Sequence, residues 1–272
     1  MAYSDQQGCD LEVPAVGSVG RRVKRILRES FVLRGAQNAS SGWVARRPLA
    51  DVPGWLGRLH DIKVPRGMPR LPSPTPLCAA NINIVLALVE RTRSVAGDLA
   101  ECGVYRGGTL IPTGLYLKQT GMAKVVHGFD SFQGFDDSVD SEIELGGIEN
   151  SEKRRGGFSD TSVRYVRDRV RRFALDDYVR IVPGYLAETL ASHSEKRFSF
   201  AHLDVDIYES YKLCMEFFYP RISSGGVILL DEYNDPPWPG CNKAVDEFLA
   251  GRPERLEEIE RDNHVKYFVQ KV

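Results

Sequence analysis

Four carboxylates stand at the ends of two apolar segments of this sequence, and together they have the chemistry to hold a metal ion. Asp204 and Asp206 follow one apolar run, and Asp231 and Glu232 follow a second run further along the chain. In an open α/β sheet the carboxyl ends of parallel strands line one crevice, so we expect these side chains to converge. Carboxylates so close together repel one another. A divalent cation that prefers oxygen ligands, such as Mg²⁺, relieves that repulsion.

A glycine-rich segment, Glu101–Thr109, is expected to join a strand to a helix. Glycines let the backbone approach a ligand closely, and a helix N-terminus presents free N–H groups. The spacing of Gly103, Gly107 and Gly108 does not match the dinucleotide fingerprint G-x-G-x-x-G. Glu101 favours a cationic ligand over a pyrophosphate, and the ammonium and sulfonium of S-adenosylmethionine meet that expectation. A tight strand–helix turn without a ligand is the alternative.

Asp130 is expected to end the next strand. An acid at this place hydrogen-bonds ribose hydroxyls in nucleotide-binding α/β folds. The alternative is an ordinary loop Asp that caps a turn. Because the glycine-rich turn lies one strand earlier, we favour the ribose contact.

These side chains need a sheet to position them, and the apolar patterning predicts one from about residue 78 onward. The expected helices cover 79–93, 107–120, 160–174, 208–222 and 242–250; the expected strands cover 98–104, 124–130, 179–184, 198–206, 226–233, 256–261 and 264–272. Strands that alternate with helices indicate a parallel sheet with helices on both faces. The last two strands are too close in sequence to be parallel, so they must pair antiparallel. We therefore predict a Rossmann-like α/β fold of seven strands with the last antiparallel, as in class I methyltransferases.

Two further segments are less regular. Residues 131–158 have no clear period and predict a loop, either a functional lid or disordered. The helix after it should be capped by Ser159 or Asp160. We expect residues 1–75 to form a basic, Pro-rich arm with a short amphipathic helix over 21–34, and residues 76–272 to form the methyltransferase domain.

Charge and composition restrict the partners. The first 80 residues hold 12 Lys and Arg against 6 Asp and Glu, yet the net charge of the 272 residues is −1. No global basic field points to nucleic acid. The basic arm could bind an acidic partner, but scattered charges favour packing on its own body or on a second subunit. No apolar run has the length of a membrane span, and no signal pattern opens the chain.

The cysteine pattern argues against a zinc site or a disulfide scaffold. The five cysteines form an odd set without C-x-x-C spacing. Free thiols are typical of a reducing compartment, so we expect a cytoplasmic protein.

Several motifs follow one another over roughly residues 75–250: Glu101-x-Gly-Val-Tyr-Arg-Gly-Gly, Asp130-Ser-Phe-x-Gly134, Leu203-Asp-x-Asp-x-Tyr-Glu-Ser210, Tyr219-Pro-x-Ile-x-x-Gly-Gly226, Asp231-Glu-Tyr and Gly240-Cys-x-Lys-Ala-Val-Asp246. In this order they resemble the macrocin O-methyltransferase family. Its members depend on Mg²⁺ and S-adenosylmethionine and methylate hydroxyls, often on antibiotic sugars. The resemblance implies a small-molecule hydroxyl acceptor that carries a sugar, a role in tailoring a natural product and, by analogy, a homo-oligomer.

The resemblance also implies roles for single residues. Asp204 is the metal ligand that serves as general base, and Asp231 and Glu232 are the other two protein ligands. Relatives often carry Asp at position 232. The implied cofactor contacts are Glu101, Gly103, Val104, Tyr105, Arg106, Gly107, Thr109, Asp130, Ser131, Phe132 and Asp204.

Three neighbours of these residues have no assigned part in the chemistry. Asp206 and Tyr208 belong to the motif, and Asp206 either supports the ligands from behind or bonds the start of the following helix. Strand alternation places His202 on the same face as Asp204. We interpret His202 as a core histidine with satisfied hydrogen bonds.

Other functions remain open at this point. Asp204-Val-Asp206 also matches the D-x-D of metal-dependent glycosyltransferases, which leaves the glycine-rich turn unexplained. An NAD-dependent dehydrogenase is a second alternative, but this sequence lacks the glycine fingerprint of that class. A non-catalytic binding module on a methyltransferase fold is the third alternative, because fold and function can separate.

Overall fold

The computed structural model describes residues 79–146, 155–261 and 263–272. The arm and its predicted helix over 21–34 lie outside the described residues. The helices are α3 (Ala79–Arg91), α4 (Leu110–Thr120), α5 (Val139–Glu144), α6 (Val163–Arg172), α7 (Leu186–Thr189), a 3₁₀ turn (Leu190–His193), α8 (Tyr208–Phe218) and α9 (Pro239–Leu249). The strands are β1 (Asp98–Cys102), β2 (Val126–Asp130), β3 (Val179–Pro183), β4 (Phe198–Leu203), β5 (Ile222–Leu230), β6 (Leu256–Arg261) and β7 (His264–Gln270).

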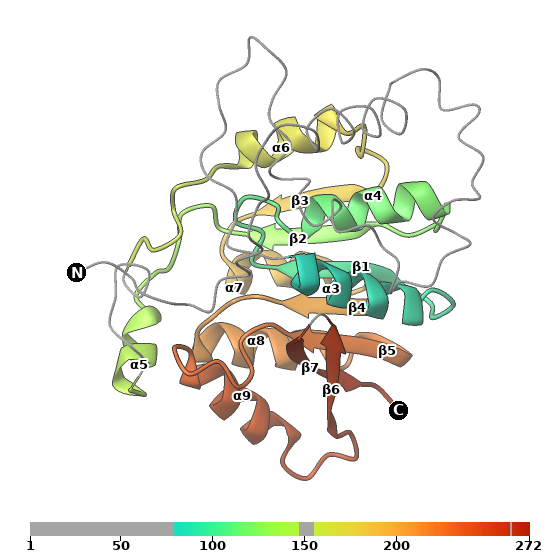
Figure 1. The fold of residues 1–272 in the computed structure, drawn as a ribbon. Coiled ribbons are helices and arrows are strands. Elements are labelled where there is room, and N and C mark those ends of the chain that lie inside the picture. The colour runs from blue at the N-terminus through green and yellow to red at the C-terminus, as the bar shows by residue number, and fades with distance from the viewer. Residues whose placement is uncertain (1–78, 147–154, 262) are drawn as a thin grey trace, which may run out of the picture. The chain divides into compact units, whose positions relative to one another are not determined.

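The seven strands form one sheet in the order β3-β2-β1-β4-β5-β7-β6 (Figure 1). The pairs from β3 to β5 are parallel, and β7 runs antiparallel to both β5 and β6. The predicted fold is therefore confirmed. The strand order reverses between β1 and β4, and in such sheets the ligand crevice lies outside the carboxyl ends of the strands at this point.

Strand alternation separates two faces of the sheet. Ala100 and Cys102 of β1 and Ala201 and Leu203 of β4 belong to the apolar core that α8 covers. Helices α3 and α4 lie against the other face (Figure 1). Because side chains alternate along a strand, Glu101 and His202 point to the face that α3 and α4 cover.

Packing of α8 and α9 onto the sheet supplies much of the core. Tyr211, Cys214, Met215 and Phe218 of α8 are fully buried. Burial of a side chain such as Met215 or Phe218 stabilises the fold by about 1.5–3 kcal/mol. The prediction of free thiols is confirmed for three cysteines in the described residues, Cys102, Cys214 and Cys241.

The segment 131–158, predicted as a loop, contains the short helix α5. Val139 and Glu142 on this helix are buried. The Glu142 carboxylate accepts hydrogen bonds from the backbone N–H of Tyr208 at 3.1 Å and of Gly240 at 2.9 Å, at the first turns of α8 and α9. A helix of 6 residues is too short to show a period, and its anchors are distant in sequence. The pattern could not reveal it.

Helix α6 starts later than predicted, because its N-cap is Ser162 and not Ser159 or Asp160. The Ser162 hydroxyl accepts a hydrogen bond from the backbone N–H of Tyr165 at 3.1 Å. Asp160 instead forms an ion pair with Arg106 in the glycine-rich turn. The Asp160 carboxylate is therefore engaged by Arg106 and does not cap the helix.

Other element boundaries moved for local reasons. Helix α8 ends at Phe218, two residues before Pro220, which has no backbone N–H to continue the helical hydrogen bonds. Helix α9 starts at Pro239, which suits the first turn of a helix. The helical turns over 186–193 were not predicted.

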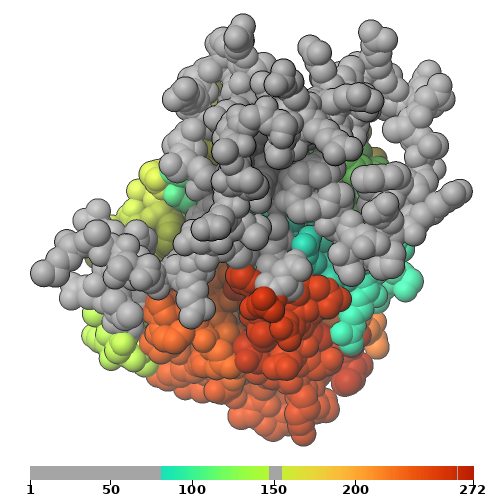
Figure 2. Space-filling view, in the orientation of Figure 1, coloured from blue at the N-terminus to red at the C-terminus, as the bar shows by residue number. Residues whose placement is uncertain are grey.

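The C-terminal third of the described chain forms one continuous surface, drawn orange to red in Figure 2. Within the residues that the structure describes, no helix has both the length and the apolar character needed to cross a membrane.

Candidate active site

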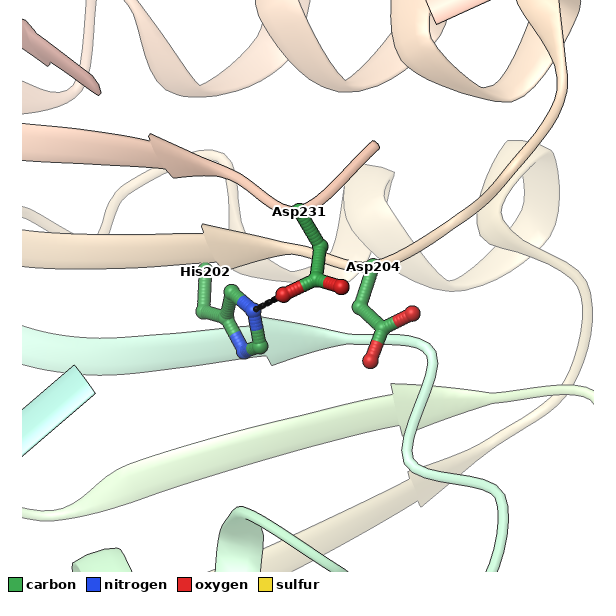
Figure 3. Close-up of side chains that lie close together, drawn as sticks. All are labelled: His202, Asp204 and Asp231. Carbon is green, nitrogen blue, oxygen red and sulfur yellow. Dashed lines mark hydrogen bonds and ion pairs between the residues drawn. The ribbon is translucent and has the colours of Figure 1, made fainter. Parts of the chain in front are cut away.

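The carboxylates predicted at the ends of β4 and β5 do converge. The backbone ladder continues into them: Asp204 N–H donates to Cys102 O at 3.0 Å, and Asp231 N–H donates to Leu203 O at 2.9 Å. Two clusters of donor atoms result, each with its atoms within 4.8 Å of one another. One cluster is His202, Asp204 and Asp231 (Figure 3), and the other is Asp204, Asp206 and Glu232. Asp204 belongs to both.

Asp231 is held between the side chains of His202 and Lys266. His202 Nε2 donates to Asp231 Oδ1 at 3.2 Å, and Lys266 Nζ donates to Asp231 Oδ2 at 2.8 Å and to its carbonyl oxygen at 2.6 Å. Burial alone would raise the pKa of Asp231, but Lys266 and His202 together hold that pKa well below the usual range. The same contacts raise the pKa of His202 and Lys266 against the opposing effect of burial. The interpretation of His202 as a buried core residue holds. The expectation that its hydrogen bonds are satisfied is wrong for one ring nitrogen, since among the described residues Nδ1 has no partner, and the partner of Nε2 is a predicted metal ligand.

Asp204 lies in an environment opposite to that of Asp231. Burial, and next the negative charge of Asp231, raise its pKa to about 6, while His202 and Lys266 act in the opposite direction. A carboxylate with a raised pKa is a stronger base than an exposed one. The environment of Asp204 therefore suits proton acceptance.

Glu232 is buried behind Asp204, and a tyrosine from α8 supports it. The Tyr211 hydroxyl accepts hydrogen bonds from the backbone N–H of Asp231 at 3.2 Å and of Glu232 at 3.3 Å, and it contacts Glu232 Oε2. Burial, and then Asp204 and Asp206, raise the pKa of Glu232 well above its usual value. Sequence reasoning missed Tyr211; its buried position on the sheet-facing side of α8 was the only available signal.

These donors fit a small divalent cation. Oxygen atoms of Asp204, Asp206 and Glu232 lie close together. Burial, and next the charges of Asp204 and Asp206, raise the pKa of Glu232, so a cation here would relieve repulsion. Carboxylate oxygens suit Mg²⁺ or Mn²⁺. Of the three predicted ligands, Asp204 lies in one cluster with Asp231 and in the other with Glu232, whereas Asp231 and Glu232 share no cluster. The structure adds Asp206 to the cluster of Asp204 and Glu232, with a left-handed backbone (φ 60°) and an N–H directed to Glu232 Oε2 at 3.3 Å. Magnesium binding by the predicted set stays a prediction.

The predicted cofactor end lies beside this cluster, at the ends of β1 and β2. Glu101 pairs in register with His202, so the two ends of the crevice meet across adjacent strands. Glu101 is 2% exposed, and among the described residues its Oε1 has no hydrogen-bond partner. Burial raises the pKa of Glu101 to about 8, against the effects of His202 and the Thr109 hydroxyl. A buried carboxyl with an unpaired oxygen fits a cationic or hydroxyl-bearing ligand.

Asp130 organises the turn around it. Its two carboxylate oxygens accept hydrogen bonds from the backbone N–H of Tyr105 at 2.7 Å and of Phe132 at 2.6 Å. Both donors have left-handed backbones, with φ of 48° and 54°. Burial raises the pKa of Asp130, and these N–H groups oppose the shift. A carboxylate has about four lone-pair positions, and these N–H groups do not occupy all of them, so a ribose contact at Asp130 is compatible with the structure.

Gly103 connects the cofactor end to the acidic cluster. It has a φ of +86°, and a Cβ placed on it would lie 1.6 Å from the carbonyl oxygen of Asp204. Only glycine fits there. We expected this glycine to admit a ligand, whereas the structure shows that it admits the backbone of Asp204.

The remaining predicted contacts occupy the same turn but have partners within the protein. Val104, Phe132 and Thr109 are buried. Arg106 forms an ion pair with Asp160, and the Ser131 hydroxyl donates to Gly134 O at 3.1 Å. Their contact with a cofactor stays a prediction.

Tyr208, a motif residue without an assigned role, faces α9. Its hydroxyl donates to Glu247 Oε2 at 2.7 Å, and the Lys243 ammonium lies 4.7 Å from its ring centre. Its side chain therefore serves the packing of α8 on α9.

A seven-stranded sheet in this order, with acids at the carboxyl ends of β1, β2, β4 and β5, defines the class I methyltransferase architecture. The macrocin O-methyltransferase (TylF) family model matches residues 80–268, and the chain belongs to this family.

Individual relatives agree with this assignment. Demethyldecarbamoylnovobiocin O-methyltransferase of Streptomyces niveus is 33% identical over 159 residues, which cover 58% of this chain and 60% of the relative. Mycinamicin III 3''-O-methyltransferase of Micromonospora griseorubida is 31% identical, over 61% of this chain and 66% of the relative. The matches thus span about three fifths to two thirds of these relatives' own lengths. The structure of the O-methyltransferase NovP superposes with a TM-score of 0.62 at 28% identity, covering 75% of this chain and 84% of NovP.

Proposed function

We propose that this protein is an O-methyltransferase that moves a methyl group from S-adenosylmethionine to a hydroxyl of a small molecule, with Mg²⁺ at the acidic cluster. The observation that carries the proposal is the position of Asp204. It belongs to both donor clusters, and its carbonyl oxygen lies against Gly103 of the glycine-rich turn. One residue thereby links the expected cofactor and metal ends of the crevice.

The cofactor end supplies a cradle for S-adenosylmethionine. Glu101 offers a buried carboxyl oxygen to the positively charged part of the molecule, and Asp130 offers free lone pairs to the ribose. We assign the adenosine neighbourhood to Ser131 and Phe132 on the resemblance. The neighbouring turn residues Val104, Tyr105, Arg106, Gly107 and Thr109 shape this cradle.

At the metal end, Asp204, Asp231 and Glu232 would hold Mg²⁺. A bound cation lowers the pKa of a hydroxyl that it contacts. Asp204 accepts the proton of the acceptor hydroxyl, and the oxygen forms a bond to the methyl carbon as the bond from carbon to sulfur breaks. The electron pair of that bond stays on sulfur, which becomes a neutral thioether. Positioning of both substrates supplies a large part of the acceleration.

The acceptor is proposed to carry a sugar. The name of one relative, 8-demethyl-8-(2,3-dimethoxy-alpha-L-rhamnosyl)-tetracenomycin-C 4'-O-methyltransferase of Streptomyces olivaceus, includes a rhamnosyl group; it is 33% identical over 57% of this chain. A homo-oligomer in the cytoplasm also stays a prediction. The glycosyltransferase alternative uses Asp204 and Asp206, and the buried Glu101 has no part in it.

The direct test is methyl transfer itself. Purified protein, S-adenosylmethionine and Mg²⁺ are incubated with a panel of deoxysugar-bearing natural products, and mass spectrometry detects the added methyl group. Parallel reactions contain EDTA or the Asp204→Asn variant. We expect methylated product only with Mg²⁺ and the unaltered protein. Equal product with EDTA contradicts the metal role, and equal product from Asp204→Asn contradicts the base assignment.

A further inference from the structure

Lys266 brings a positive charge to the acidic cluster from the only antiparallel strand next to β5 in the described sheet. Tyr267 of β7 pairs in register with Leu230, so Lys266 lies opposite Asp231, where β5 has just ended. Its Nζ lies 2.8 Å from Asp231 Oδ2 and 2.6 Å from Asp231 O. The side chain is 16% exposed.

Burial of a lysine needs a compensating partner. Removing an ammonium from water costs free energy unless the charge is paired and hydrogen-bonded. Among the described residues, Asp231 is the one carboxylate within salt-bridge distance of Lys266. The structure therefore pairs this largely buried charge with one predicted metal ligand.

A divalent cation would have to share Asp231 with this ammonium. Oδ1 already meets His202 Nε2 at 3.2 Å, and Oδ2 meets Lys266. Two cations on one carboxylate repel each other, and the repulsion is strong where water is excluded. Lys266 thus opposes what Asp231 contributes to metal binding.

We propose that Lys266 is an internal cation that weakens divalent-metal binding at Asp231 and holds this carboxylate in place when no metal is bound. The inference rests on the metal site of the proposed function. It makes Mg²⁺ an exchangeable component of the site, and it lets the cofactor end bind its ligand without metal.

Calorimetric titration of Mg²⁺ into metal-stripped protein saturated with S-adenosylhomocysteine tests this role. Lys266→Met keeps the length and apolar stem of the side chain but removes its charge. We expect it to bind Mg²⁺ at least about tenfold more tightly than the unaltered protein. Lys266→Arg keeps a cation and should remain within about threefold of the unaltered protein. The affinity for S-adenosylhomocysteine should be the same in all variants.

Asp231→Asn separates failure of this inference from failure of the metal site. Saturable Mg²⁺ binding that is lost in Asp231→Asn but equal or weaker in Lys266→Met overturns the role of Lys266 alone. The absence of saturable Mg²⁺ binding in the unaltered protein overturns the metal site as well. If Lys266→Met does not fold, as judged by its thermal unfolding transition, Lys266→Gln takes its place as the neutral variant with the same expected gain.

Discussion

The two halves of the crevice carry similar acids but balance their charge differently. At the ends of β1 and β2, Glu101 and Asp130 contact hydroxyl and backbone N–H groups, and no salt bridge reaches them within the described residues. At the ends of β4 and β5, Asp231 is paired with both Lys266 and His202. The acids at the ends of β1 and β2 can therefore pair with a positively charged ligand. At the ends of β4 and β5, the protein itself already supplies a positive charge through Lys266.

This difference indicates separate tasks. Glu101 has its pKa raised to about 8 by burial, so it is ready to be stabilised by a cationic cofactor. Asp204, with a pKa of about 6, stands between the halves and stays basic.

Asp204→Asn should have the largest effect. The amide cannot accept the proton of the acceptor hydroxyl, so turnover should fall by about 10²–10⁴-fold. The affinity for S-adenosylhomocysteine should change by less than about threefold, since Glu101 and Asp130 remain. Turnover comes from the methyl-transfer assay and affinity from calorimetry. Loss of cofactor binding together with turnover would show that the two halves do not act separately.

Glu101→Gln should affect the cofactor end alone. Loss of a charged hydrogen-bond partner should weaken S-adenosylmethionine binding by about 10–100-fold at pH 8. The Mg²⁺ affinity serves as the control and should not change. An unchanged cofactor affinity would make Glu101 a structural acid only.

The pH dependence of cofactor binding is a second test of the role of Glu101. A cationic ligand prefers the ionised carboxylate, so a group with a pKa of about 8 must lose its proton on binding. Affinity for S-adenosylmethionine should rise by up to about tenfold per unit between pH 7 and pH 8 and level off above that. Glu101→Gln should give a flat profile over this range. A flat profile in the unaltered protein contradicts the assignment.

Tyr211→Phe should weaken Mg²⁺ binding indirectly, because Tyr211 supports the backbone of Asp231 and Glu232. The change removes the acceptor for the backbone N–H of Asp231 and Glu232 in a buried place. The free energy of unfolding should fall by about 1–3 kcal/mol, as measured by urea denaturation. Mg²⁺ affinity should decrease while S-adenosylhomocysteine affinity stays. A fall in both affinities would point to general loosening of the fold.

Tyr208→Phe should have the smallest effect, although Tyr208 lies in the acidic motif. The variant loses a surface hydrogen bond to Glu247 and keeps the ring. Turnover should stay within about twofold of the unaltered protein, because exposed polar pairs contribute little. A large loss of turnover would place Tyr208 in the reaction.

The succession of strands and helices along the chain could be predicted from sequence, and so could the approach of Asp204 to Asp231 and to Glu232, because both follow from local apolar patterning and the geometry of parallel sheets. The division of these acids into two clusters could not be predicted. Lys266 and Tyr211 could not. Lys266 meets Asp231 only through the register of an antiparallel strand, and Tyr211 reaches the site from the buried side of α8. Gly103 was expected to let the backbone approach a ligand closely, but its close neighbour is the carbonyl oxygen of Asp204.

The most direct test of the central claim is calorimetric titration of metal-stripped protein with S-adenosylhomocysteine, with NAD and a nucleotide sugar as controls. We predict saturable binding of S-adenosylhomocysteine at one site, strongly weakened in Glu101→Gln, and no comparable binding of either control. Metal-dependent binding of the nucleotide sugar without any binding of S-adenosylhomocysteine would contradict the account and assign Asp204 and Asp206 to a glycosyltransferase site.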